Sequence, residues 1–204
     1  MTRTIDREST SAAALQAAMR QMEDYWHELR GQHRLPQRRA VDPARLSAAL
    51  PHAFLLQRVA PRVGRLRVAG QRLTQLLGMD PRGMPLSTFF HGEAREVVGA
   101  RLADLFDKPA IVELPLAARR GLARPRLTGR MIALPLIGDD GLVSAALGAL
   151  MVDGEIGTPP RRLEIGPGLT RVDPLVRQRP RPDEFAHGFA ERRRPYLQLI
   201  VDND

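Results

Sequence analysis

The order of apolar patterns along the chain is the feature that most constrains its fold. Two runs of alternating apolar residues, typical of half-buried strands, are followed by helical patterns and then by three more strand-like runs. Two strands at one end of a core and three at the other can join in one five-stranded antiparallel sheet, with helices covering one face. We therefore predict an α+β fold. The expected strands cover 53–59, 65–69, 111–118, 127–137 and 143–152.

Helices are expected before and between these strands. A short helix is predicted over 43–50, another over 73–77, and a longer one over 92–107, because their apolar residues recur at helical spacing between Pro or Gly breaks. Proline removes a donor from a strand ladder. Pro115 and Pro135 are therefore expected at edges, bulges or kinks of the sheet.

The first helix is expected to begin near Ala12 and to carry one apolar stripe, whose members recur at steps of three and four residues. One apolar face must be buried, so the stripe packs either on its own domain or on a second copy of the chain. Both alternatives are open, and we favour the second copy, which predicts a homodimer. The candidate dimer face comprises Leu15, Met19, Met22, Trp26 and Leu29.

The patterns divide the chain into four segments. Residues 1–11 are expected to be a disordered leader, 12–52 a helical extension, 53–153 the core, and 154–204 a tail rich in Pro and Arg. Within the tail, residues 196–201 have a strand-like pattern that could dock on the core or on a partner.

Composition excludes several classes of protein. The 204 residues include no Cys, so disulfides, thiolate nucleophiles and cysteine-ligated metals are excluded. No run of about 18 apolar residues is present, and the N-terminus lacks the apolar core of a secretion signal, so we expect a cytoplasmic protein without a membrane span. The net charge of +8 comes from scattered arginines with acidic residues between them, so binding to nucleic acid is unlikely but remains an alternative.

Standard catalytic patterns are missing. No glycine-rich loop ends in Gly-Lys, and no serine lies in a nucleophile elbow. His27-Glu28 begins like a zinc-protease helix, but Gly31 replaces the second ligand. The five histidines show no metal-ligand spacing. We therefore expect no enzymatic activity, no metal and no cofactor.

A series of short motifs follows the expected strands and helices in order. They are Tyr25-Trp26-x-x-Leu29-Arg30, Pro36-x-Arg38, Asp42-Pro43-x-x-Leu46, Leu50-Pro51-x-x-Phe54-Leu55-Leu56, Arg65-x-Arg67-x-Ala69-Gly70, Gly78, Gly83, Leu134-Pro135-Leu136 and Leu147-Gly148-Ala149-Leu150. With these motifs, and with strands and helices in the PAS order, the chain resembles a PAS-like family of bacterial, mostly proteobacterial, proteins of largely undefined function. The resemblance covers about residues 20 to 153.

This resemblance implies a PAS fold and a role in signalling, but it carries over no ligand. PAS domains often hold a ligand between the sheet and the helices, and some bind haem through a histidine near the position of His91. For His91 we expect a solvated place at the helix start. The inward-facing set either lines a pocket or fills the core, and we favour a filled core. This set comprises Phe54, Leu56, Leu66, Val68, Leu73, Leu77, Phe89, Phe90, Leu102, Phe106, Leu114, Leu134 and Leu147.

The resulting functional hypothesis is a stand-alone sensory or regulatory PAS module. No kinase, cyclase or helix-turn-helix pattern accompanies the core, so its output is expected to pass through an unknown signalling protein. One alternative is a sensor with a small molecule of unknown identity in the core. The other is a basic protein that binds nucleic acid.

Overall fold

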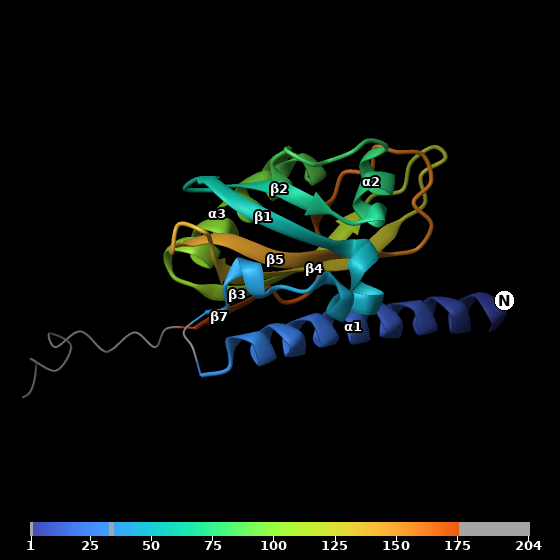
Figure 1. The fold of residues 1–204 in the computed structure, drawn as a ribbon. Coiled ribbons are helices and arrows are strands. Elements are labelled where there is room, and N and C mark those ends of the chain that lie inside the picture. Colours follow the sequence, from blue (N-terminus) through green and yellow to red (C-terminus); the bar gives the residue numbers. More distant parts are fainter. Residues whose placement is uncertain (1, 33–34, 176–204) are drawn as a thin grey trace, which may run out of the picture.

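The computed structural model describes residues 2–32 and 35–175. One antiparallel sheet follows the order β2-β1-β5-β4-β3-β6, and β7 also pairs with β3. Helices α2 and α3 cover one face, while α1 runs along the other (Figure 1). The strands are β1 (Ala53–Ala60), β2 (Val63–Ala69), β3 (Ala110–Ala118), β4 (Leu127–Ile137), β5 (Val143–Asp153), β6 (Glu164–Ile165) and β7 (Arg171–Pro174).

The two predicted groups of strands meet where β1 pairs with β5. Leu55 of β1 lies opposite Leu147 of β5, β1 and β2 form a hairpin, and β3, β4 and β5 form a meander. All five predicted strands are present. The predicted α+β fold with a single antiparallel sheet is therefore confirmed.

Both strand prolines lie where a neighbouring ladder is interrupted. Pro115 separates the stretch of β3 that pairs with β7 from the stretch that pairs with β6. Pro135 lies beyond the part of β4 that pairs with β3, and its carbonyl accepts a hydrogen bond of 3.0 Å from Nε1 of Trp26. The missing N–H of each proline is thus placed where the sheet does not require it.

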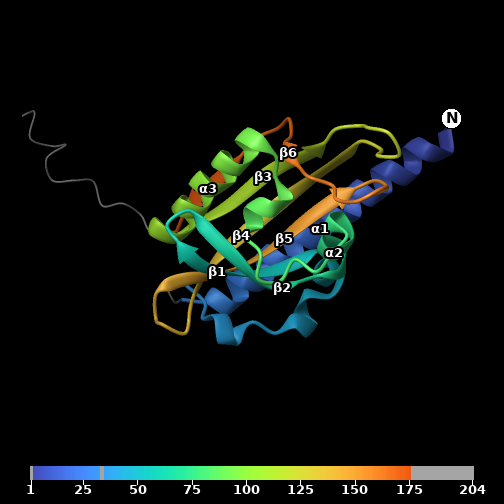
Figure 2. The same ribbon diagram turned by 90° about the horizontal axis from the view of Figure 1, so that it is seen from above.

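A first apolar cluster lies between the sheet and the helices on one of its faces. Figure 2 shows α2 and α3 over this face of the sheet. These helices are α2 (Gln71–Leu77), the 3-10 turn η3 (Leu86–Phe89) and α3 (Gly92–Asp107). Alternate residues of β1, β4 and β5 point into this cluster, since successive side chains of a strand point to opposite faces. This cluster is the core that the sequence predicts between the sheet and the helices.

A second apolar cluster lies under the opposite face of the sheet and contains the stripe of α1 (Thr2–Arg30). Met19, Met22 and Trp26 are buried there against β4 and β5, and Leu15 and Leu29 are partly buried at its margin. The stripe therefore packs on its own domain. Its use as the dimer face was the wrong alternative, because the second face of the sheet is also apolar and supplies the partner.

The helix α1 is longer than predicted. We expected a disordered leader over 1–11, but α1 begins at Thr2. No Pro or Gly interrupts residues 2–11, so nothing in this segment stops the helix from extending toward the N-terminus. After α1, the 3-10 helices η1 (Arg38–Ala40) and η2 (Pro43–His52) lead into β1.

The segment 154–175 belongs to the domain and is not a mobile tail. Leu163 is fully buried, and β6 and β7 pair with β3. Arg161 is 2% exposed, and its guanidinium donates to the backbone oxygens of Ile156 and of Pro125, the latter at 2.6 Å. These hydrogen bonds satisfy a buried charge that composition alone assigns to solvent. The strand-like pattern at 196–201 lies outside the described residues.

Candidate functional site

Most of the predicted inward-facing residues meet in the cluster between the sheet and the helices. Those found there are buried, with at most 4% of each exposed. They are Phe54, Leu56, Leu66, Leu73, Leu77, Phe89, Phe90, Leu102, Phe106 and Leu114. Burial of this set is expected both for a filled core and for the walls of an enclosed pocket, so a filled core stays a prediction.

Three members of the set were placed wrongly. Val68 is 54% exposed, because a register shift between Leu55 and Leu56 adds an extra residue in β2 and turns Val68 to the face opposite Leu66. Leu134 and Leu147 are buried, but on the other face of the sheet, in the second apolar cluster between the sheet and α1. Their strands are apolar at almost every position, so alternation could not assign a face.

A cavity lies on the α1 face of the β1–β2 hairpin, largely outside this core. It has a volume of about 570 Å³, and we call it the η2 groove because η2 forms one wall. Its floor comes from β1, β2 and β5. The lining residues are Arg38, Arg39, Val41, Pro43, Leu46, Leu50, Pro51, Ala53, Phe54, Leu55, Val68, Ala69, Gly70, Gln71 and Leu147.

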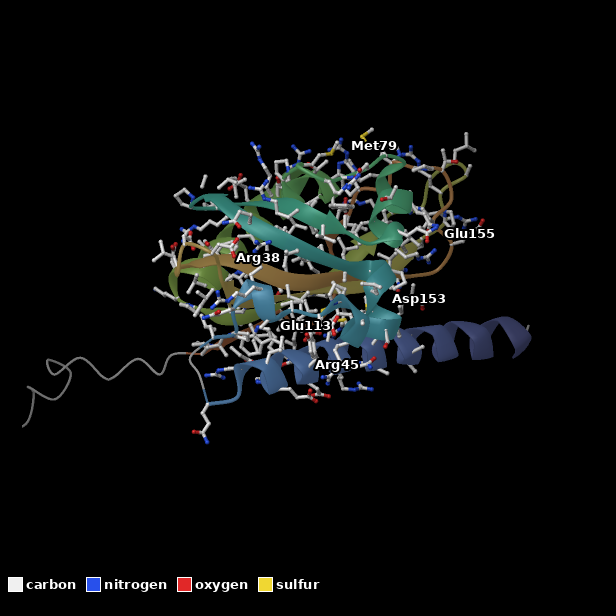
Figure 3. All side chains as sticks on the ribbon, viewed as in Figure 1. Arg38, Arg45, Met79, Glu113, Asp153 and Glu155 are labelled. Carbon is white, nitrogen blue, oxygen red and sulfur yellow. The ribbon has the colours of Figure 1, made fainter. Side chains whose placement is uncertain are left out.

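Two arginines give the η2 groove a positive end. Both come from η1, and no carboxylate is among the lining residues. Arg38 pairs with Asp139 at 2.5 Å, whereas Arg39 is exposed and its Nε donates to the side-chain oxygen of Gln37 at 2.6 Å. Arg38 is labelled in Figure 3. The groove thus combines an apolar body with a cationic end. No pattern in the sequence reveals this groove, because its lining comes from η1, η2, β1, β2, α2 and β5.

The wall formed by η2 is attached to α1. The hydroxyl of Tyr25 accepts a hydrogen bond from the backbone N–H of Asp42 at 2.7 Å. Arg45 pairs with Glu28 at 2.7 Å and lies 5.2 Å from the centre of the Tyr25 ring (Figure 3). Inside η2, Ser47 has a φ of 36°, a backbone conformation that is costly for a residue other than glycine. A displacement of η2 would therefore alter its contacts with α1.

An ionic cluster joins α1, the sheet and the C-terminal strand β7. Arg171 of β7 bonds to Glu23 of α1 at 2.6 Å, lies 3.4 Å from Glu113 of β3, and lies 3.1 Å from Asp173. Glu113 is 9% exposed and also accepts a hydrogen bond from Arg130 (Figure 3). The hydrogen bond with Glu23 is the main cause that raises the pKa of Arg171 above its usual value. These contacts fix the docked position of α1.

The histidines form no recognisable site among the described residues. His91 is exposed at the N-cap of α3, which agrees with the solvated place expected for it. His52 is buried, and burial is the main cause that lowers its pKa below 6.5, with Arg72 adding to the effect. No group of three or more potential metal-ligating side chains occurs within the described ranges. His33 and His187 lie outside those ranges.

The arginines that gave the chain its basic character form separate ion pairs. Some of these pairs join neighbouring elements, whereas Arg82–Asp80 lies within one loop and Arg101–Asp104 within α3. The pairs include Arg45–Glu28, Arg58–Asp107, Arg62–Glu96, Arg82–Asp80, Arg101–Asp104 and Arg119–Glu164. This dispersal gives no support to a nucleic-acid interface, which needs a continuous cationic surface.

Comparison with known proteins supplies the family. A family model described as "PAS domain" matches residues 15–151. The chain belongs to the PAS domain family. The match begins within α1 and ends in β5, so this PAS domain has the segment with β6 and β7 as an addition. Membership of this family supports a sensory module.

No curated protein matches the chain. Among solved structures, the one described as "Flavin Analogue Sheds Light on Light-Oxygen-Voltage Domain Mechanism" is similar with a TM-score of 0.38 and 18% sequence identity, over 54% of this chain and 82% of that chain. In the part of this PAS domain that the structure describes, no helix has the length and hydropathy needed to cross a bilayer.

Proposed function

We propose that this PAS domain is a regulatory module without enzymatic activity or a resident cofactor, and that its output is contact with another protein. The observation that carries the proposal is the junction of α1 and β7. Arg171 bonds to Glu23, so the helix that leads into the PAS core and the strand that leads out of it are held together on one face of the sheet.

Such a junction suits a regulatory element because one helix, α1, carries both its apolar and its ionic contacts with the rest of the domain. The stripe of α1 contributes apolar burial, and the ion pairs around Arg171 set its position. A partner that binds either chain segment better in one arrangement than in another would shift the equilibrium between them. The bulky side chains buried between the sheet and the helices, among them Phe54, Phe89 and Phe90, favour this proposal over a ligand held there.

The C-terminal residues are the proposed contact segment for the partner. Deleting all of 154–204 would also remove β6, β7, Arg161 and Leu163 and so damage the domain. The deletion should therefore begin after Leu175. A homodimer remains a prediction, and it now requires a surface other than the α1 stripe.

The experiment compares the full chain with a chain that ends at Leu175. A partner is captured by the full chain from a lysate of the source cells, identified by mass spectrometry, purified, and titrated against both chains. We expect binding to fall at least about tenfold for the shortened chain, while its circular dichroism and melting temperature match those of the full chain. Equal affinity of the two folded chains would refute the role of the C-terminal segment.

A further inference from the structure

The η2 groove has the dimensions of a small-molecule site, although it lies outside the PAS core. Its volume of about 570 Å³ falls within the roughly 300–1,000 Å³ typical of ligand pockets. Val68 and Leu50 are 54% and 44% exposed in it, and they face further apolar side chains of η2 and β1. Exposed apolar side chains gathered in one concave site are typical of a binding surface.

The charges at one end of the groove indicate what the ligand carries. Arg39 has no carboxylate partner among the described residues, and its contact with Gln37 occupies only Nε. The Nε of Arg38 is buried and has no hydrogen-bond partner, while its Nη2 contacts Asp139. A guanidinium presents a planar fork of donors that matches a carboxylate. The lining therefore fits a ligand with an anionic head.

We propose that the η2 groove binds a small amphipathic carboxylate, such as a medium-chain fatty acid. The carboxylate lies against Arg39 and Arg38, and the alkyl chain lies over Val68 and Leu55 beneath the wall of η2. This inference goes beyond the proposed function and does not rest on it. Most of the groove lies outside the cluster between the sheet and the helices, with which it shares Phe54.

The position of the groove gives such a ligand a route to α1. The ligand would bridge η2 on one side and the β1–β2 floor on the other. Because Asp42 and Arg45 tie this wall to Tyr25 and Glu28 of α1, a ligand that orders η2 also orders the contacts of α1. Amide hydrogen exchange in η2 should therefore slow when the site is filled.

The first experiment titrates the full chain with octanoate, decanoate and dodecanoate below their micelle concentrations, using isothermal titration calorimetry. Each buried methylene is worth about a fourfold gain in affinity, so each step of two carbons should strengthen binding by about fifteenfold until the groove is filled. The methyl ester of decanoate keeps the chain but removes the charge. It should bind several-fold more weakly than decanoate.

Paired variants locate the site. Val68→Glu places a carboxylate on the floor and should abolish binding of decanoate. Val59→Glu, at a 46% exposed valine of the same hairpin outside the groove, should leave binding unchanged. Arg39→Ala should remove the preference for the acid over the ester, whereas Arg65→Ala, at an exposed arginine of β2 outside the lining, should preserve it. All four substituted side chains are exposed, and melting temperatures confirm folding.

Several results would overturn the inference. These are no binding of any of the acids, an ester that binds as tightly as the acid, or equal losses from Val68→Glu and Val59→Glu. Protection of amides in α3 instead of η2 would place the ligand in the PAS core and refute the site. The carboxylate series, the residue-specific losses and slowed exchange in η2 together would establish it. Partner binding is not measured in these assays, so their failure leaves the proposed function standing.

Discussion

Replacing Met22 by alanine tests how α1 is held on the sheet. Met22 is 1% exposed in the cluster beneath the sheet, and the substitution removes most of its side chain from a packed site. If the stripe packs on its own domain, the loss appears as lower stability of the folded chain. If the stripe were an interface between copies, the loss would appear as weaker association.

The expected magnitude follows from the burial. Truncation of a buried Met to Ala costs about 2–5 kcal/mol, and a site between one helix and a sheet can relax in part, so we expect about 3 kcal/mol. With a urea dependence of about 2–3 kcal/mol per M for a chain of this size, the unfolding midpoint falls by about 1–1.5 M. The free energy of unfolding should not depend on protein concentration.

The single tryptophan provides a fluorescence signal specific to the α1 region. Trp26 is fully buried one turn from Met22, so its fluorescence reports the docking of α1 while circular dichroism reports the whole fold. Urea unfolding is followed by both signals at two protein concentrations. Gln21→Ala, at an exposed position on the same helix, is the matched control and should change stability by less than about 0.5 kcal/mol.

Two results would refute this reasoning. A Met22→Ala chain as stable as the control would show that the stripe is not buried against the sheet. A midpoint that rises with protein concentration would show that the stripe joins two copies. A Trp26 transition that precedes the circular dichroism transition would instead show that α1 undocks before the sheet unfolds, as the proposed function requires.

Three further predictions concern other parts of the domain. Arg171→Ala leaves the buried Glu113 with fewer partners and should cost about 1–3 kcal/mol, measured by thermal unfolding. Burial holds the pKa of His52 below 6.5, so the unfolded chain binds the proton more readily; stability should fall as the pH drops below about 6.5, and His52→Gln should flatten this dependence in urea titrations. Gly148→Ala would place a Cβ 2.4 Å from the Phe54 ring, and calorimetry should show a loss of about 1–3 kcal/mol or more.

The sequence was most informative where the spacing of apolar residues and the positions of Gly and Pro indicate the same element. The helix predicted over 92–107 and the strand predicted over 127–137 have those bounds in the structure. Gly and Pro breaks limit each of them, and their apolar spacing is clear. Local signals of this kind depend only on near neighbours in the chain.

Features that depend on distant residues could not be predicted. The extra residue in β2 that exposes Val68 leaves no mark in the alternating pattern of that strand. The burial of Arg161 depends on carbonyl groups contributed by other loops. The η2 groove joins residues of η1 and η2 to residues of β1, β2 and β5, and no single motif contains them. In each case the deciding contact is tertiary.

The pairing of β6 and β7 with β3 also prevents the edge of the sheet from pairing with a strand of another chain. An open strand presents unpaired N–H and C=O groups that can template association with another chain. Here Ala110 to Glu113 and Leu116 to Ala117 of β3 are already paired within the chain. A proteolytic cut between β5 and β6 that released this segment would therefore do more than loosen the domain. It would expose β3 as an unpaired edge strand, and the cut protein should aggregate while most of its core is still folded.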